Sequence, residues 1–279
     1  MATDMSGSPR FAGFRSRPPG LGKRGGRRPG PHLAGPFPGV PGPPNLPFVD
    51  FGIKWWLNRG VLAGWRWLDG IGKITPGTRA AAGFGSFGAD SSIGFPSATL
   101  MNTRSIHLGT GVLVGRQVTL AVGYWPDYPG IPERGLVIGD RCVIGDRCSL
   151  LAHASIELGD DVWFGQDVFV CDASHGYQDP DLPIGEQFGG HLPVRIGSNS
   201  WVGHGAIILP GTTIGRNVVV AAGSVVRGEV ADHCVVGGAP AKLLRRLEPG
   251  VGWVGVRGDV RPVRRGHFGG GEEQGFVSA

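Results

Sequence analysis

The chain has 279 residues, of which 52 are glycine and 23 are proline, and its net charge is +5. It contains no uncharged apolar run of 18 residues, as a membrane-spanning helix needs, and no apolar stretch near its start that would suggest a signal peptide. The four cysteines form no CxxC pair, which favours a reducing compartment. We therefore expect a cytoplasmic protein.

Residues 1–49 account for the net positive charge of the chain, with seven Lys or Arg residues and one acidic residue. Pro, Gly and Arg dominate this segment and cannot bury enough surface to fold, so we predict a disordered tail. A basic tail can also contact anionic lipid or nucleic acid. Since the charge is confined to a tail and does not line a groove, we expect no nucleic-acid partner.

A tryptophan-rich helix is predicted within residues 50–83. Leu57, Val61, Trp65 and Leu68 recur at helical spacing. Four tryptophans lie in this segment together with lysine and arginine, a composition suited to a membrane interface. Two interpretations stay open: the helix packs against the domain that follows, or it makes a peripheral contact with a membrane.

A six-residue repeat occupies residues 84–246. An aliphatic residue, usually followed by glycine, returns every six positions, as in IGDRCV, IGDRCS, LGDDVW, FGQDVF, IGSNSW, VGHGAI and IGRNVV. A fixed short period indicates a solenoid, and a period of six fits a short strand with a tight corner. Three such units make one triangular coil of 18 residues, which stacks Ile196 on Ile214 and Val202 on Val220. We predict an all-β fold, a parallel β-helix, in which Cys142 and Cys148 are small core residues.

Two insertions interrupt the repeat, at residues 123–134 and 173–192. Insertions into a solenoid form loops, and such loops commonly carry function. His175 lies at the start of the longer insertion, in DASHGYQDPD. An ordinary imidazole suits a general base near neutral pH, although an isolated loop histidine can equally be structural.

The stretch from Leu158 to Arg246 resembles the hexapeptide acyltransferases, in particular the maltose and galactoside O-acetyltransferases and their polysaccharide-modifying relatives. The most specific part is the ending GGAPAKLLRR, and the resemblance extends back to at least Leu108. It implies a left-handed β-helix, acetyl-CoA as co-substrate, a homotrimer with sites between subunits, and direct transfer to an acceptor hydroxyl. The family's catalytic histidine matches His175.

The resemblance also implies residues that bind CoA. Small residues among them would let the pantetheine of CoA lie flat against the side of the β-helix, and basic residues would neutralise its phosphates. The matching positions are His204, Ala222, Gly223, Arg227, Lys242 and Arg245.

The acceptor and the support of His175 are less defined by sequence. The family's acceptor-binding positions fall here on Gly145 and His153, so we expect a sugar, glycan or glycolipid acceptor that differs from maltose or a galactoside. His153 either contacts this acceptor or is structural. Asp172 and Glu186 are candidates to orient His175, as are Asp179 and Asp181.

Two other functions compete with acyl transfer. One is a metal hydratase, which needs three converging histidines. His153, His175 and His204 are separated by whole coils, so we expect no metal. The other is a non-catalytic scaffold. Residues 247–279 are rich in glycine, and we predict a flexible tail there.

Overall fold

The computed structural model describes residues 50–264, with side chains from Lys54 onward. The predicted tail over 1–49 and the end of the predicted C-terminal tail, residues 265–279, lie outside the described residues. From Trp55 onward the described chain belongs to one compact unit.

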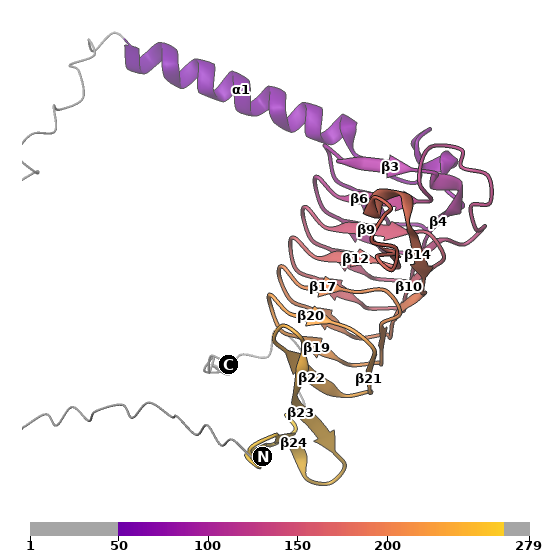
Figure 1. Cartoon of the computed structure of the whole chain (residues 1–279). Helices are drawn as coiled ribbons and strands as arrows, with labels where there is room; N and C mark the ends of the chain where they lie inside the picture. Colours follow the sequence, from indigo (N-terminus) through magenta and orange to yellow (C-terminus); the bar gives the residue numbers. More distant parts are fainter. Residues whose placement is uncertain (1–49, 265–279) are drawn as a thin grey trace, which may run out of the picture. The chain divides into compact units, whose positions relative to one another are not determined.

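Parallel strands stacked coil on coil build a β-helix with three faces (Figure 1). One face has seven strands: β1 Ser86–Phe87, β4 Ile106–Leu108, β7 Leu136–Ile138, β10 Ile156–Leu158, β15 Val194–Ile196, β18 Thr213–Ile214 and β21 Glu229–Val230. A second face has six strands: β3 Thr99–Met101, β6 Thr119–Val122, β9 Ser149–Ala152, β12 Phe169–Cys171, β17 Ile207–Ile208 and β20 Val225–Val226. The third face begins with seven strands: β2 Ser92–Ile93, β5 Leu113–Val114, β8 Val143–Ile144, β11 Trp163–Phe164, β16 Trp201–Val202, β19 Val219–Val220 and β22 Cys234–Gly237. The fold is the predicted left-handed β-helix.

The predicted stacking of the repeat is confirmed. Ile196 pairs with Ile214 and Val202 with Val220, and all four side chains are buried. One inward-facing residue per strand therefore joins a continuous column, and these columns form the core. Cys142 and Cys148 are also fully buried in it.

The glycines that directly follow the aliphatic residue of the repeat are needed for a reason other than the one the sequence suggests. A Cβ added to Gly139 would lie 2.6 Å from the carbonyl oxygen of Gly159, one coil further on. The left-handed backbone conformation of this corner occurs two residues later, at Arg141, with φ of 55°. Glycine is thus required by the close approach of successive coils.

The helix α1, Asp50–Gly72, agrees with the predicted segment, but it does not pack along the β-helix. Its apolar positions, including Val61 and Trp65, are exposed within the chain. Its last turn is attached through an ion pair of 3.2 Å between Asp69 and Arg116. The packing interpretation is therefore wrong for most of the helix. No helix among the described residues is long and apolar enough to cross a bilayer.

We predicted a flexible tail after residue 246, but the structure has further strands there. Antiparallel strands extend the third face beyond β22, and they end only at Arg261. These strands are β23 Lys242–Glu248, β24 Gly252–Gly255 and β25 Val260–Arg261. For residues 247–264 the prediction is wrong because the backbone of β22 offers a sheet edge with which a further strand can pair.

Candidate functional site

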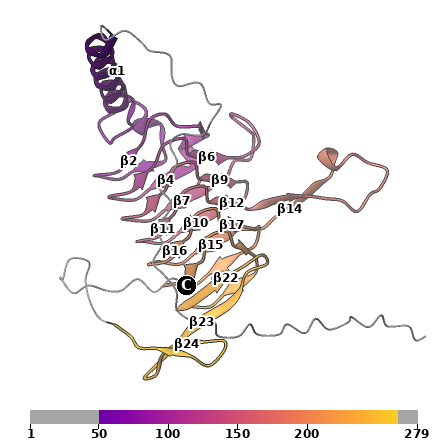
Figure 2. The same ribbon diagram turned by 90° about the vertical axis from the view of Figure 1, so that its left-hand side faces the viewer.

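His175 lies on a hairpin that projects from one corner of the β-helix (Figure 2). The hairpin consists of β13, Ala173–His175, and β14, Phe188–His191, and His175 pairs with Phe188. The histidine is exposed. Within residues 50–264 its ring has no hydrogen bond or ion pair, so it is open to an acceptor that approaches from solvent.

Asp172 has another role than orienting His175. Its carboxylate is completely buried and accepts hydrogen bonds from the backbone N–H groups of His153, Ala154 and Ser155, at 2.7, 2.8 and 2.7 Å. These residues form the equivalent corner one coil earlier. Asp172 therefore supports the site by fixing the corner from which the hairpin starts.

Glu186 lies in a 3-10 turn, Ile184–Glu186, at the far end of the hairpin and is exposed. The loop there is organised by Gln187, whose side-chain amide donates to the carbonyls of Asp179 and Leu182 at 2.8 and 3.0 Å. Glu186, Asp179 and Asp181 form no bond to His175, in keeping with the open ring of that histidine.

The two insertions, far apart in sequence, meet beside His175. Tyr124, from the first insertion, lies 5.9 Å from the ring of Phe188 and 4.5 Å from that of His153, both edge to face. Trp125 and Tyr128 extend the cluster, with their ring centroids 4.6 Å apart. The result is a partly exposed aromatic surface, which we name the aromatic cluster.

Two histidines complete the polar side of this cluster. His191, on β14, stacks on His153 at a centroid distance of 5.4 Å. The Nε2 atom of His191 lies 2.5 Å from the hydroxyl oxygen of Tyr124. The Nδ1 atom of His153 is buried and lies 3.4 Å from Asp172.

His153, Cys171 and Asp172 lie close enough together to be considered as metal ligands. The donor chemistry fits a metal poorly. The carboxylate of Asp172 already binds three N–H groups, and burial raises the pKa of the Cys171 thiol, which disfavours the thiolate that a metal binds. The only cluster of this kind in the described residues contains one histidine, so the hydratase alternative receives no support.

His204, Ala222 and Gly223 share a different corner, between the third face and the six-stranded face. All three are exposed. Gly223 has a φ of +68° and nothing within 4 Å of an added Cβ, so this corner is both strained for other residues and open. His204 Nδ1 lies 3.5 Å from Asp167. Small residues thus leave room along this edge for an extended ligand.

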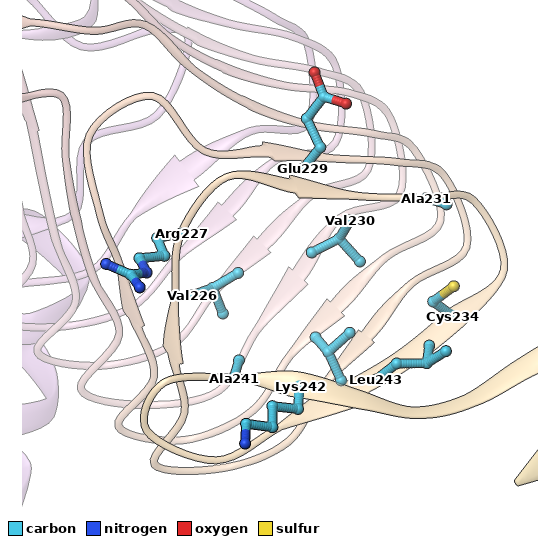
Figure 3. Close-up of a pocket in the computed structure, with 10 residues that line it drawn as sticks. Val226, Arg227, Glu229, Val230, Ala231, Cys234, Ala241, Lys242 and Leu243 are labelled. Carbon is cyan, nitrogen blue, oxygen red and sulfur yellow. The ribbon is translucent and has the colours of Figure 1, made fainter. Parts of the chain in front are cut away.

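Arg227 and Lys242 line one cavity of about 260 Å³ at the end of the last coil (Figure 3). Val226 and Val230 form part of its apolar wall, and both positively charged groups lie at its rim. Glu229 also lines the cavity, and its carboxylate points away from both basic groups (Figure 3). The structure therefore brings together two of the three basic residues that the sequence assigned to CoA phosphate.

Arg245 differs from these two residues. It lies on β23, its side chain is only 18% exposed, and its guanidinium forms an ion pair with Asp259. This ion pair holds the pKa of Asp259 below its ordinary value. Since Arg245 is bound within the chain, it is less available for a phosphate than Arg227 or Lys242.

One chain does not bring the corner of His175 and the corner of His204 together. Asp167, at the His204 corner, and Asp172, at the His175 corner, flank the strand β12 on the six-stranded face. Four residues lie between them, three of which form β12, so the two aspartates are roughly 15 Å apart. The corners therefore lie at opposite edges of the same face.

Sequence reasoning missed Tyr124 and His191, because no local motif marks either residue. One signal was available. Val122 stacks on Ala152, and Leu151 stacks on Cys171, so both insertions follow equivalent strand ends of one sheet. Loops that leave the same edge of a sheet two coils apart can meet.

Comparison with known proteins agrees with this fold. Residues 193–228 match the family described as bacterial transferase hexapeptide (six repeats), and residues 135–163 match the hexapeptide repeat of succinyl-transferase. A solved structure of a variant of AntD, an N-acyltransferase from Bacillus cereus in complex with dTDP and coenzyme A, is similar with a TM-score of 0.53. It is 20% identical and the match covers 63% of this chain and 91% of that one, so the likeness concerns the fold.

Several curated relatives are named as acetyltransferases. One from Mycobacterium tuberculosis is 39% identical over 116 residues, which are 42% of this chain and 39% of the relative. Galactoside O-acetyltransferase from Lactococcus lactis is 39% identical over 93 residues, 33% of this chain and 44% of the relative. A lipopolysaccharide biosynthesis O-acetyl transferase from Escherichia coli is 35% identical over 99 residues, 33% of this chain and 50% of the relative. The chain thus spans half or less of the length of these relatives. It is a left-handed β-helix protein built from the hexapeptide repeat of bacterial transferases, and it resembles the hexapeptide-repeat acyltransferases.

Proposed function

We propose that the chain transfers an acetyl or short acyl group from CoA to a hydroxyl of a sugar, glycan or glycolipid. The observation that carries this proposal is the exposed His175, presented on a hairpin that is inserted between two regular coils. The acetyltransferase relatives agree with it, including those named for galactoside and lipopolysaccharide.

His175 acts as the general base. It accepts the proton of the acceptor hydroxyl while the oxygen attacks the thioester carbonyl carbon. The tetrahedral intermediate then collapses, the C–S bond breaks, and the protonated imidazole returns its proton to the leaving thiolate. The reaction yields the ester and free CoA, so atoms and charges balance without a metal.

CoA binds along the corner of His204, Ala222 and Gly223 and ends at the cavity of Arg227 and Lys242. The exposed small residues leave room for the pantetheine, and the two basic groups neutralise phosphate.

The acceptor binds against the aromatic cluster. A sugar ring has an apolar C–H face that packs on aromatic rings. Phe188, which pairs with His175, is 76% exposed, and Trp125, which contacts Tyr124, is 53% exposed. His153 contributes to this wall through its contact with Tyr124.

The active species is a homotrimer whose sites lie between subunits. The two corners of one chain are too far apart to form a site, but the His175 corner of one copy can meet the His204 corner of the next. This requires the six-stranded faces to turn toward a three-fold axis. Phe169 and Ile207, each 37% exposed, present apolar side chains on that face.

The helix α1 attaches the cytoplasmic enzyme peripherally to a membrane. Its exposed tryptophans, among them Trp65 and Trp67, and the cation–π contact of Arg59 with Trp55 suit the polar–apolar boundary of a bilayer. Flotation with anionic vesicles tests this: replacing Trp65 and Trp67 by Ser should abolish co-flotation, whereas replacing Trp163 should not.

The central test of the function is His175→Ala. We expect loss of acetyl transfer to a sugar acceptor with unchanged binding of CoA. The matched control is His233→Asn, since Asn tolerates the φ of 54° at that position, away from the hairpin. Full activity in His175→Ala would refute the mechanism.

A further inference from the structure

The hairpin that carries His175 is held together by its own backbone. Gly176 N donates to Gln187 O at 2.8 Å, and at the base of the hairpin Leu192 N donates to Asp172 O at 2.7 Å. These bonds join the two strands to each other. They do not fix how the hairpin lies against the β-helix, which depends on contacts between the hairpin and the body.

Apart from the backbone hydrogen bond of 2.9 Å that Gly211 N donates to Leu192 O at the base of the hairpin, those contacts converge on two residues of the body. Within residues 50–264, and apart from the local contact of Cys171 with Ala173, the ring contacts and side-chain hydrogen bonds of the hairpin strands all involve Tyr124 or His153. Among the described residues, Tyr124 alone contacts both Phe188 and His191. In this same part of the chain, its hydroxyl also forms the one side-chain hydrogen bond between the body and β14, to His191.

The residues that Tyr124 holds are the direct pairing partners of β13. Phe188 pairs with His175, and His191 pairs with Ala173. A displacement of β14 therefore moves His175 through a single step of strand pairing. The register of this pairing shifts between Ala173 and His175.

The chemistry of Tyr124 suits a lasting hydrogen bond. Burial raises the pKa of its phenol, and the charges of Tyr128 and Asp172 raise it further. The phenol therefore stays protonated at neutral pH and can donate to the Nε2 atom of His191 in the tautomer that leaves this nitrogen without a proton.

We propose that Tyr124 is a positioning residue that latches the hairpin to the β-helix through His191 and thereby sets the location of His175. The first insertion, whose second residue is Tyr124, supplies this latch. The catalytic consequence rests on the proposed acyl transfer, whereas the structural consequence does not.

The test compares Tyr124→Phe with Tyr128→Phe. Both variants keep the aromatic ring, but the hydroxyl of Tyr128 has no hydrogen-bond partner in the described part of the chain. In Tyr124→Phe we expect faster hydrogen exchange in residues 173–176 and 188–192, and unchanged exchange in the strands of the β-helix. We expect kcat to fall about tenfold or more with an unchanged KM for acetyl-CoA, because misplacing a base affects the chemical step.

Rescue separates a positioning role from a merely structural one. His191→Gln keeps an oxygen that accepts from Tyr124 and should retain more activity than His191→Phe. Adding Tyr124→Phe to His191→Phe should cost little more, since the bond is already lost.

Each outcome decides one proposal. Unchanged hairpin exchange in Tyr124→Phe, or equal effects in both tyrosine variants, would overturn the latch even if the wild-type chain transfers acetyl groups. Faster exchange confined to Tyr124→Phe would support the latch even if the wild-type chain shows no transferase activity. In that case the proposed function would be refuted and the latch would stand.

Discussion

The buried carboxylate of Asp172 accepts a hydrogen bond of 2.7 Å from the backbone N–H of His153, one coil earlier in the β-helix. Two further N–H groups bind the same carboxylate. A single side chain thus joins the base of the hairpin to the corner that contacts the aromatic cluster.

We predict that Asp172→Asn lowers the free energy of unfolding by about 1–3 kcal/mol, because an amide NH₂ would then face a buried N–H group. Urea unfolding measures this, and hydrogen exchange at Ala154 and Ser155 should accelerate. Asp146→Asn is the control, since Asp146 accepts one corner N–H, from Arg116, through one oxygen that asparagine retains. Equal losses in both variants would contradict the special role of Asp172.

Two arginine–aspartate pairs each link a corner of one coil to the equivalent corner of the next. These pairs predict that the stability of the protein falls at acidic pH. Arg141 binds Asp161 and Arg147 binds Asp167, each through two nitrogen–oxygen contacts of 2.7–2.8 Å. The hydrogen bond from arginine holds the pKa of each aspartate below its ordinary value.

A carboxyl whose pKa is lowered by folding contributes stability above its unfolded pKa, near 4, and this contribution is lost as pH falls through the folded pKa. We therefore expect Tm to decline as the pH falls below about 4. The double variant Asp161→Asn with Asp167→Asn should show a shallower decline in a thermal scan, and a small loss at neutral pH because the pairs are exposed. If Tm of the double variant declines as steeply as that of the wild type, other carboxyl groups cause the loss of stability at acidic pH.

Trp125 is predicted to bind the acceptor. Trp125→Ala should raise KM for a sugar acceptor about tenfold and leave KM for acetyl-CoA unchanged, because only the aromatic surface beside His175 is reduced. Trp163→Ala is the matched control, since Trp163 is 57% exposed but lies on the third face. Initial rates with each substrate varied in turn would show the difference, and a similar change in both variants would exclude the aromatic cluster as the acceptor surface.

Sequence predicted the regular part of this molecule well, because a fixed repeat length determines which residues lie on top of one another in successive coils. The stacking of Ile196 on Ile214 follows from counting 18 residues, as does the return of the coil after the insertion. The contact between Tyr124 and His191 could not be counted in this way, since each lies in an irregular insertion and their meeting depends on how both loops fold. The ion pair between Arg245 and Asp259 could not be predicted either, because it depends on strands β23 and β24, which pair after the repeat ends.

The last prediction concerns the site between subunits. Arg227→Ala combined with Lys242→Ala should abolish productive CoA binding, whereas His175→Ala should abolish chemistry, and each variant alone should be inactive. We expect each site of a trimer to combine the His175 corner of one copy with the Arg227 cavity of the next. A trimer that contains both variants then has some sites in which the histidine and the basic residues are both intact.

Unfolding and refolding the two inactive variants together in equal amounts should therefore restore about a quarter of the wild-type activity, as random assembly of a closed ring predicts. Mixing without refolding should restore none, and Phe169→Asp, which puts a charge on the six-stranded face, should yield an inactive monomer by light scattering. If co-refolded variants form trimers but remain inactive, both corners of a site must come from one chain. That outcome would require the hairpin to carry His175 toward the His204 corner, across the roughly 15 Å between Asp172 and Asp167.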